Sequence, residues 1–316
     1  MAVAFVFPGQ GSQTVGMGKA LADAHPAAAA VFAEVDEALG QKLSALIWDG
    51  PEEALTLTAN TQPALMAVSL AALRALEAEG VALAGTASFV AGHSLGEYSA
   101  LAAAGALTVA DAARLLRIRG NAMQAAVPRG QGAMAALLGL DFDAADAVAR
   151  EAAEAGGVCQ AANDNAPGQV VVSGDKAAVE RAVEIAKGCG AKRAMLLNVS
   201  APFHCALMRP AADAMAEALA AVTVSTPVVP VVANVTAGPE TDPDRIRAHL
   251  VAQVTGTVRW RESIGWLAGT AGVDGFVEVG NGKVLAGLIK RIAPEARSAG
   301  YGQPADLAAV KALLGL

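Results

Sequence analysis

The chain has 316 residues, of which 54% are hydrophobic, and a formal net charge of −7. The apolar content excludes a disordered chain. The acidic balance argues against a nucleic-acid-binding surface, which needs a clustered basic excess. The length fits one large α/β domain that carries an insertion.

The cysteine content and the hydropathy of the sequence indicate the cellular compartment in which the protein is expected. Three cysteines form neither a metal-ligand array nor a disulfide framework, so we expect a reducing, cytoplasmic compartment and no bound metal. The opening run MAVAFVFPGQ has no basic leader and is expected to be a strand, and no apolar segment is long enough to cross a bilayer. The sequence therefore predicts a soluble protein without a membrane partner.

Strand-length and helix-length patterns alternate along much of the chain. Apolar runs predict strands at 3–7, 88–91, 228–233 and 275–279. Helices are expected at 26–39 and 63–79, since each begins at a proline and ends just before a glycine. Such alternation predicts a mostly parallel sheet that is covered on both faces.

The motif G-x-S-x-G places Ser94 between Gly92 and Gly96. A predicted strand precedes it and a predicted helix follows, which is the strand–turn–helix context of a nucleophile elbow. The serine hydroxyl would then lie at a helix N-terminus, where free N–H groups can stabilise an oxyanion. The alternative is a small serine in the glycine-rich turn of an ordinary α/β fold.

An arginine lies on the apolar face of the next predicted helix, which starts at Thr108 with Asp111 in capping-box-like spacing. At 3.6 residues per turn, Arg119 falls in the middle of the apolar stripe, whereas Arg114 and Arg117 project to the other side. A buried guanidinium needs an anionic partner. That partner is either a protein carboxylate or the carboxylate of a substrate, such as a malonyl group.

The middle of the chain has a different order of elements. The pattern predicts βαββαβ, the ferredoxin-like split unit, inserted into a larger body. The domains would be 1–130 with 199–316, and 131–198. The expected elements are strands at 133–138, 158–162, 169–173 and 193–199, helices at 143–155 and 176–187, and a turn at 164–168.

The serine needs a base, and the chain has four histidines. His204 is favoured because it follows the last strand of the insertion, where the chain re-enters the body. His93 is expected to support the turn, and His25 and His249 to be solvated or capping residues. The candidate acids for a third member between Ser94 and His204 all fall in the inserted unit: Asp141, Asp143, Asp164 and Asp175. A Ser–His dyad is therefore at least as plausible as a triad.

Several segments together resemble one family, the malonyl-CoA:acyl carrier protein transacylases of type II fatty-acid synthesis. They run almost end to end along the chain: FVFPGQGSQ (5–13), TQPALMA (61–67), GHSLGEYSAL (92–101), RG at Arg119, PGQVVVSG (167–174), FHCALM (203–208) and EVGNGKVL (278–285). The chain departs slightly from the family at Asn281, where proline is usual, and at 254–257.

The resemblance implies an α/β-hydrolase-like domain and a role for each matched residue. Ser94 would be the acylated nucleophile and His204 its base, oriented by a main-chain carbonyl near Gln253. The backbone N–H groups of Gln10 and Leu95 would form the oxyanion hole. Arg119 would bind the malonyl carboxylate, and Phe203 resembles the pattern of malonyl-selective members.

The same resemblance implies the substrates and partners. Malonyl-CoA, a coenzyme A thioester, would donate to the phosphopantetheine thiol of an acidic acyl carrier protein, with no bound cofactor. We expect a monomer, and a carrier-docking patch formed by basic residues at Lys187, Lys192, Arg193, Lys290 and Arg291.

Other functions fit the sequence less well. A thioesterase would share the elbow and the base but would give its acyl group to water, and it gives no reason for Arg119. A non-catalytic carrier-binding subunit would not need Ser94. The loops GQGSQ and GNGK lack the spacing of a Rossmann fingerprint and of a P-loop.

Overall fold

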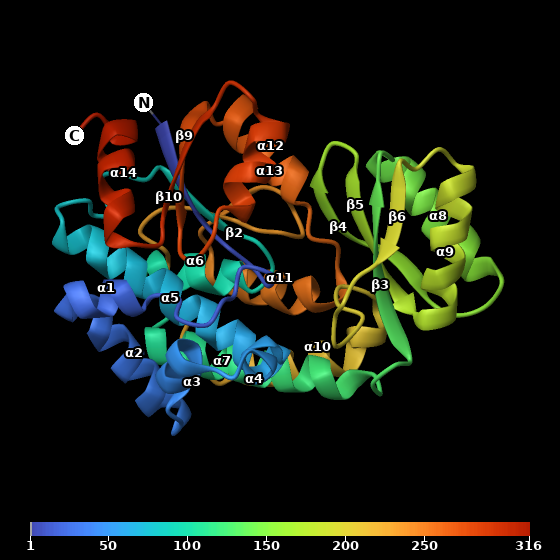
Figure 1. Cartoon of the computed structure of the whole chain (residues 1–316), viewed down its shortest axis with the longest axis horizontal. Helices are drawn as coiled ribbons and strands as arrows, with labels where there is room; N and C mark the ends of the chain where they lie inside the picture. Colours follow the sequence, from blue (N-terminus) through green and yellow to red (C-terminus); the bar gives the residue numbers. More distant parts are fainter. Residues whose placement is uncertain (1) are drawn as a thin grey trace.

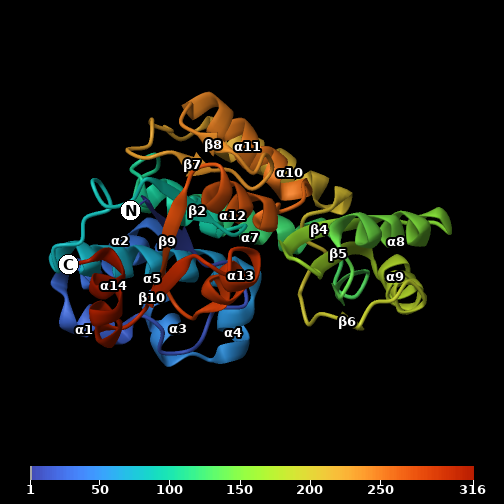
Figure 2. The ribbon, with the colours of Figure 1, turned by 90° about the horizontal axis from the view of Figure 1, so that it is seen from above.

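The structure, a computed structural model, describes residues 2–316. The chain forms a large body with a six-stranded sheet and a smaller unit with a four-stranded sheet, which lies to one side of the body (Figure 1). Both views agree on this arrangement, and both termini lie on the body, away from the small unit (Figures 1 and 2).

The large sheet is mostly parallel, as the alternating pattern predicts. Its strand order is β10-β9-β1-β2-β7-β8, and only the β7–β8 pair is antiparallel. The strands are β1 (Ala2–Phe7), β2 (Phe89–Gly92), β7 (Val231–Val232), β8 (Pro239–Glu240), β9 (Val273–Val279) and β10 (Arg297–Tyr301).

Alternating side chains of β1 fill two different cores. Phe5 and Phe7 pack into a large cluster with α5 (Thr58–Ala78), α6 (Gly96–Ala103) and α7 (Val109–Ala126). Ala4 and Val6 face the opposite cluster, which α12 (Trp260–Gly269) and α13 (Val284–Ile292) complete. Since successive side chains of a strand point to opposite faces, an uninterrupted apolar strand requires helices on both faces. The body thus holds the end of β2, and the elbow that follows it, in a rigid frame.

The helices of the body mostly belong to the large cluster. Their bounds are α1 (Lys19–Ala24), α2 (Pro26–Leu39), α3 (Leu43–Asp49), α4 (Glu52–Thr56), α5 (Thr58–Ala78), α6 (Gly96–Ala103), α7 (Val109–Ala126), α10 (Arg209–Ala220), α11 (Pro243–Thr255), α12 (Trp260–Gly269), α13 (Val284–Ile292) and α14 (Leu307–Leu314), with short 3-10 turns at Ala206–Met208 and Pro304–Asp306. None of the helices in the described part of the chain combines the length and apolarity needed to span a bilayer.

The small unit has the predicted element order. Its antiparallel sheet, in the order β4-β5-β3-β6, packs on two helices over a core of its own. The elements are β3 (Gly132–Leu138), α8 (Phe142–Glu154), β4 (Cys159–Ala166), β5 (Gln169–Asp175), α9 (Lys176–Gly188) and β6 (Arg193–Leu196).

Two sequence predictions in this unit were wrong, both beside the body. The turn expected at 164–168 is shorter, because β4 continues to Ala166 and Asp164 N–H bonds the Val258 carbonyl of the body at 2.9 Å. The last strand ends at Leu196 rather than at residue 199. From there the chain leaves the sheet, and Asn198 and Val199 line a cavity instead.

The start of α5 and the extent of β7 also differ from the sequence prediction. The helix begins at Thr58, not at Pro63, so Pro63 lies inside it. The run at 228–233 contains Pro230, which has no N–H for a ladder, and only Val231–Val232 form a strand.

Candidate active site

Ser94 occupies a tight turn between β2 and α6, as the motif predicts. Its φ of 54° lies in the left-handed region, which is unusual for a residue with a side chain. A Cβ at Gly92 would lie 1.9 Å from the Gly96 carbonyl, and one at Gly96 would lie 2.3 Å from the Phe7 carbonyl. Both glycines are therefore required where strand and helix cross. The strained turn presents the hydroxyl at the start of α6.

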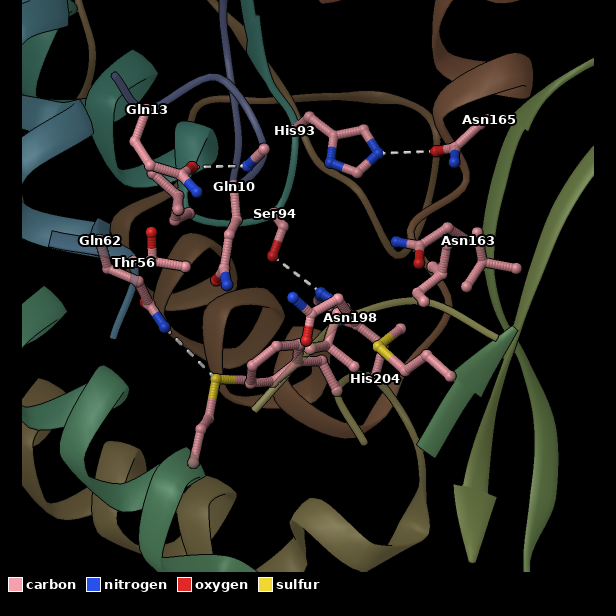
Figure 3. Close-up of a pocket in the computed structure, with 18 of the residues that line it drawn as sticks. Gln10, Gln13, Thr56, Gln62, His93, Ser94, Asn163, Asn165, Asn198 and His204 are labelled. Atoms are coloured by element: carbon pink, nitrogen blue, oxygen red, sulfur yellow. Dashed lines mark hydrogen bonds between the residues drawn. The ribbon is translucent and has the colours of Figure 1, made fainter. Parts of the chain in front are cut away.

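His204 lies opposite the serine, on the segment that returns from the small unit. Its Nε2 is 2.7 Å from Ser94 Oγ (Figure 3). Its Nδ1 is 2.9 Å from the main-chain oxygen of Gln253. A carbonyl oxygen can only accept, so Nδ1 carries the proton and Nε2 accepts from the serine hydroxyl. No carboxylate contacts the imidazole among residues 2–316.

The histidine is buried, and this fixes its charge. Burial, and next the positive charge of Arg119, lower the pKa of His204 from 6.5 to about 3. The imidazole is then neutral at ordinary pH and free to accept a proton. Its φ of 58° is again left-handed, so both residues of the pair are held in strained backbone.

Arg119 is buried in the middle of α7, where the apolar stripe places it. Its guanidinium donates to Gln62 Oε1 at 2.8 Å, to Gln253 Oε1 at 2.8 Å and to Ser94 Oγ at 3.1 Å. It forms no ion pair within residues 2–316, and its Nε has no hydrogen-bond partner there. Burial lowers its pKa. A charged group held by neutral amides beside a serine hydroxyl is suited to an anionic ligand.

The two predicted backbone donors belong to the same cavity. Gln10 and Leu95 line it together with Ser94, and neither of their N–H groups bonds an acceptor in the described chain. The loop that carries Gln10 packs closely against the turn at Ser94, since a Cβ at Gly9 would lie 2.6 Å from the His93 carbonyl oxygen. Asn281 Nδ2 ties this loop to the end of β9 through the Ser12 carbonyl at 2.6 Å. Backbone N–H groups without a protein acceptor are the kind of donor that an oxyanion hole uses, as the sequence predicts for these two residues.

These groups surround a cavity of about 350 Å³ between the body and the small unit. Phe203 and Met123 contribute apolar walls, and Asn163 and Asn165 reach in from β4 (Figure 3). No cluster of His, Cys, Asp or Glu within residues 2–316 could hold a metal ion. The structure thus brings together all seven residues that the sequence analysis singled out.

The other histidines and acids have separate partners. His93 Nε2 bonds Asn165 Oδ1 at 2.8 Å, in keeping with a supporting role. His249 lies 4.0 Å from Glu240, away from the cavity. Asp164 pairs with Arg261 at 2.8 Å, and Asp141 caps α8. None of these acids reaches His204.

Four side chains at this site were not predicted from the sequence. Gln62 and the side chain of Gln253 hold Arg119, and Glu97 lies behind them, accepting from Gln253 Nε2 at 2.8 Å. Asn234 Oδ1 accepts the Ser94 N–H at 2.7 Å and fixes the elbow. A signal existed for two of them, because Gln62 and Glu97 are polar residues inside otherwise buried apolar runs. Burial raises the pKa of Glu97 to about 7.

The geometry has a counterpart among known proteins. A family model described as an acyl transferase domain matches residues 4–303. The chain belongs to this family. Malonyl CoA-acyl carrier protein transacylase of Escherichia coli strain K12 is 51% identical over 307 residues, and the match covers 97% of each chain.

Solved structures of this family agree with the fold. An acyl-carrier-protein-S-malonyltransferase from Bartonella henselae is 55% identical, with a TM-score of 0.97 and complete coverage of both chains. Another, 45% identical with a TM-score of 0.94 and complete coverage, is a malonyl-transacylase in complex with a holo type II polyketide acyl carrier protein. These similarities place the chain among the malonyl transacylases of the acyl transferase family.

Proposed function

We propose that the protein transfers the malonyl group of malonyl-CoA to the phosphopantetheine thiol of acyl carrier protein, through a malonyl ester of Ser94, and so supplies extender units for fatty-acid synthesis. The observation that carries the proposal is Arg119, a buried cation that forms no ion pair with a carboxylate of residues 2–316 and lies 3.1 Å from Ser94 Oγ. The names of the relatives point to the same substrate and acceptor.

In the first step, Ser94 Oγ attacks the thioester carbon of malonyl-CoA while His204 Nε2 takes its proton. The carbonyl oxygen becomes an oxyanion that accepts from the N–H groups of Gln10 and Leu95. The C–S bond then breaks, and the imidazolium returns the proton to the coenzyme A sulfur. The main-chain oxygen of Gln253 holds His204 in the required tautomer, so a Ser–His dyad suffices.

The second step reverses the first with a different thiol. His204 accepts the proton of the phosphopantetheine thiol, and the sulfur attacks the ester carbon. The C–O bond to Ser94 breaks and the serine regains the proton. Because coenzyme A leaves before the carrier reacts, the kinetics are ping-pong, and no bound cofactor takes part.

Selectivity has two sources in this proposal. The carboxylate of the malonyl group replaces neutral amide acceptors on Arg119 with a bidentate ion pair. Phe203, which is buried in the wall beside His204, leaves no room for a branch on the acyl chain. An acetyl group fits sterically but leaves the guanidinium unpaired.

The architecture follows from the same proposal. We assign 1–130 and 199–316 to an α/β-hydrolase-like domain and 131–198 to a ferredoxin-like subdomain, because the small sheet has its own core and the βαββαβ order. A monomeric state and a cytoplasmic location stay predictions from the sequence.

The acidic carrier needs a basic surface, and the predicted patch requires one change. Lys192 and Arg193 are exposed on the small unit. Arg291, however, donates to the Pro167 carbonyl at 2.6 Å and to Gln169 Oε1. Arg291 therefore joins α13 to the small unit, and we keep Lys187, Lys192, Arg193 and Lys290, which are exposed, as the proposed carrier-docking patch.

The choice of acceptor separates this function from a thioesterase. We expect that malonyl-CoA with holo acyl carrier protein gives malonyl-carrier and free coenzyme A in equal amounts. Without carrier, coenzyme A release stops after one equivalent per enzyme. Mass spectrometry of the carrier and a thiol assay measure both. Continued release of free malonate without carrier would identify a hydrolase instead.

A further inference from the structure

A hydrogen-bond chain connects Arg119 to the loop of Gln10 and lies outside the Ser–His pair. Arg119 Nη1 donates to Gln62 Oε1 at 2.8 Å, and Gln62 Nε2 donates to Thr58 Oγ1 at 2.9 Å. Thr58 Oγ1 then donates to Gln10 Oε1 at 3.1 Å. This hydrogen-bond chain connects the side of the cavity that would bind the malonyl carboxylate to the side that would bind the acyl oxygen.

The direction of every bond in this chain follows from the arginine. A guanidinium can only donate, so Gln62 must present its oxygen to Arg119 and its nitrogen to Thr58. The hydroxyl of Thr58 accepts that N–H and has one proton left, which goes to Gln10 Oε1. Thr58 is therefore the group that links the two glutamine side chains: it accepts from Gln62 and donates to Gln10.

The middle of this hydrogen-bond chain is buried away from water. Thr58 and Gln62 are buried, and they lie on α5 where α7 passes closest. A Cβ at Gly120, next to Arg119, would lie 2.7 Å from the Thr58 carbonyl, so only glycine allows this approach. Loss of the Thr58 hydroxyl leaves Gln62 Nε2 with only a weak sulfur acceptor, Met123 Sδ at 3.7 Å, so one of its N–H groups is left unsatisfied.

We propose that Thr58 is a positioning residue that couples the guanidinium of Arg119 to the oxyanion-binding loop at Gln10. Its hydroxyl keeps the Gln62 oxygen on Arg119 and holds the Gln10 side chain against α5, so that the Gln10 N–H faces the acyl oxygen. This inference rests on the function proposed above. It assigns to α5 a role in both the rate and the choice of acyl group.

The test compares Thr58→Val, which removes the hydroxyl at constant shape, with Thr58→Ser, which keeps it. For Thr58→Val we expect kcat for malonyl transfer to fall about tenfold, the equivalent of one unsatisfied buried donor, with a smaller change in KM. Acylation by acetyl-CoA should fall less, about threefold, because it uses the Gln10 loop but not Arg119. Thr58→Ser should react with malonyl-CoA and with acetyl-CoA at rates within about twofold of those of the parent protein.

Thr61→Val is the matched control. Thr61 is also fully buried on α5, and its hydroxyl donates to the Leu55 carbonyl at 2.6 Å, outside the chain. The Thr61→Val substitution should lower the melting temperature without changing the ratio of the malonyl transfer rate to the acetyl transfer rate. Equal ratios for Thr58→Val and Thr61→Val, measured per active site, would overturn the proposal.

Two further readings keep the result decisive. If Thr58→Val does not fold, Gln10→Met removes the exposed end of the chain while keeping the backbone N–H, and parental kcat in that variant would overturn the role of Gln10. The parent protein is measured in the same assay with malonyl-CoA and holo acyl carrier protein. Failure of the parent to form malonyl-carrier would contradict the proposed function rather than the role of Thr58.

Discussion

Replacement of Arg119 by alanine is expected to lower kcat/KM for malonyl-CoA by roughly 10²- to 10⁴-fold, because a buried ion pair that loses one partner costs about 3–5 kcal/mol. Acylation by acetyl-CoA is expected to change less than about tenfold, since acetyl has no carboxylate to lose. The substitution therefore changes the ratio of the two donors. Competition between malonyl-CoA and acetyl-CoA for the same enzyme measures that ratio directly.

Arg114→Ala is the control for this prediction. Arg114 lies on the same helix, but its side chain is exposed and pairs with Asp111 at 3.2 Å. Both donors should react with this variant at close to the parental rate. If Arg119→Ala lowers malonyl and acetyl transfer equally, the guanidinium serves the fold or the serine and not the substrate carboxylate.

Replacement of His204 by asparagine is expected to slow acylation of Ser94 by about 10²- to 10⁴-fold, the usual contribution of a general base. Asparagine is chosen because it tolerates the positive φ of 58° better than other residues that cannot act as bases. The loss should appear in kcat for both donors. Rapid-quench measurement of the acylation rate separates it from any change in binding.

His249→Asn is the control variant for this substitution, since His249 lies one turn before Gln253 on α11 and outside the cavity.

The pH profile of acylation supplies a second check on His204. A folded pKa near 3 means that His204 keeps its neutral, basic form as the pH falls through 6.5. If the acylation rate of the parent protein instead falls as the pH is lowered, with a midpoint near 6.5, the usual pKa of histidine, this account of the buried imidazole is wrong.

Local patterns were sufficient for the elbow and for Arg119. Ser94 followed from two glycines between a strand and a helix, and the burial of Arg119 followed from its phase on α7. Both features depend on residues close in sequence. The βαββαβ order of the small unit was predicted for the same reason, although β4 and β6 end differently where they meet the body.

Contacts between distant segments could not be predicted in this way. Gln62 is 57 positions from Arg119 and Gln253 is 134 positions from it, so no periodicity relates them. The helix boundary added to the difficulty, because a start at Pro63 would leave Thr58 and Gln62 outside α5. The edge strand β10 was missed because its sequence, RSAGY, is exposed over its first residues and has no apolar run.

The most direct measurement of the central claim is the intact mass of the protein after brief mixing with equal amounts of malonyl-CoA and acetyl-CoA, beside Ser94→Ala. We predict a malonyl adduct on the parent alone, which holo acyl carrier protein then removes. An unmodified parent that accumulates free malonate, or an adduct that persists in Ser94→Ala, would contradict a malonyl-serine intermediate.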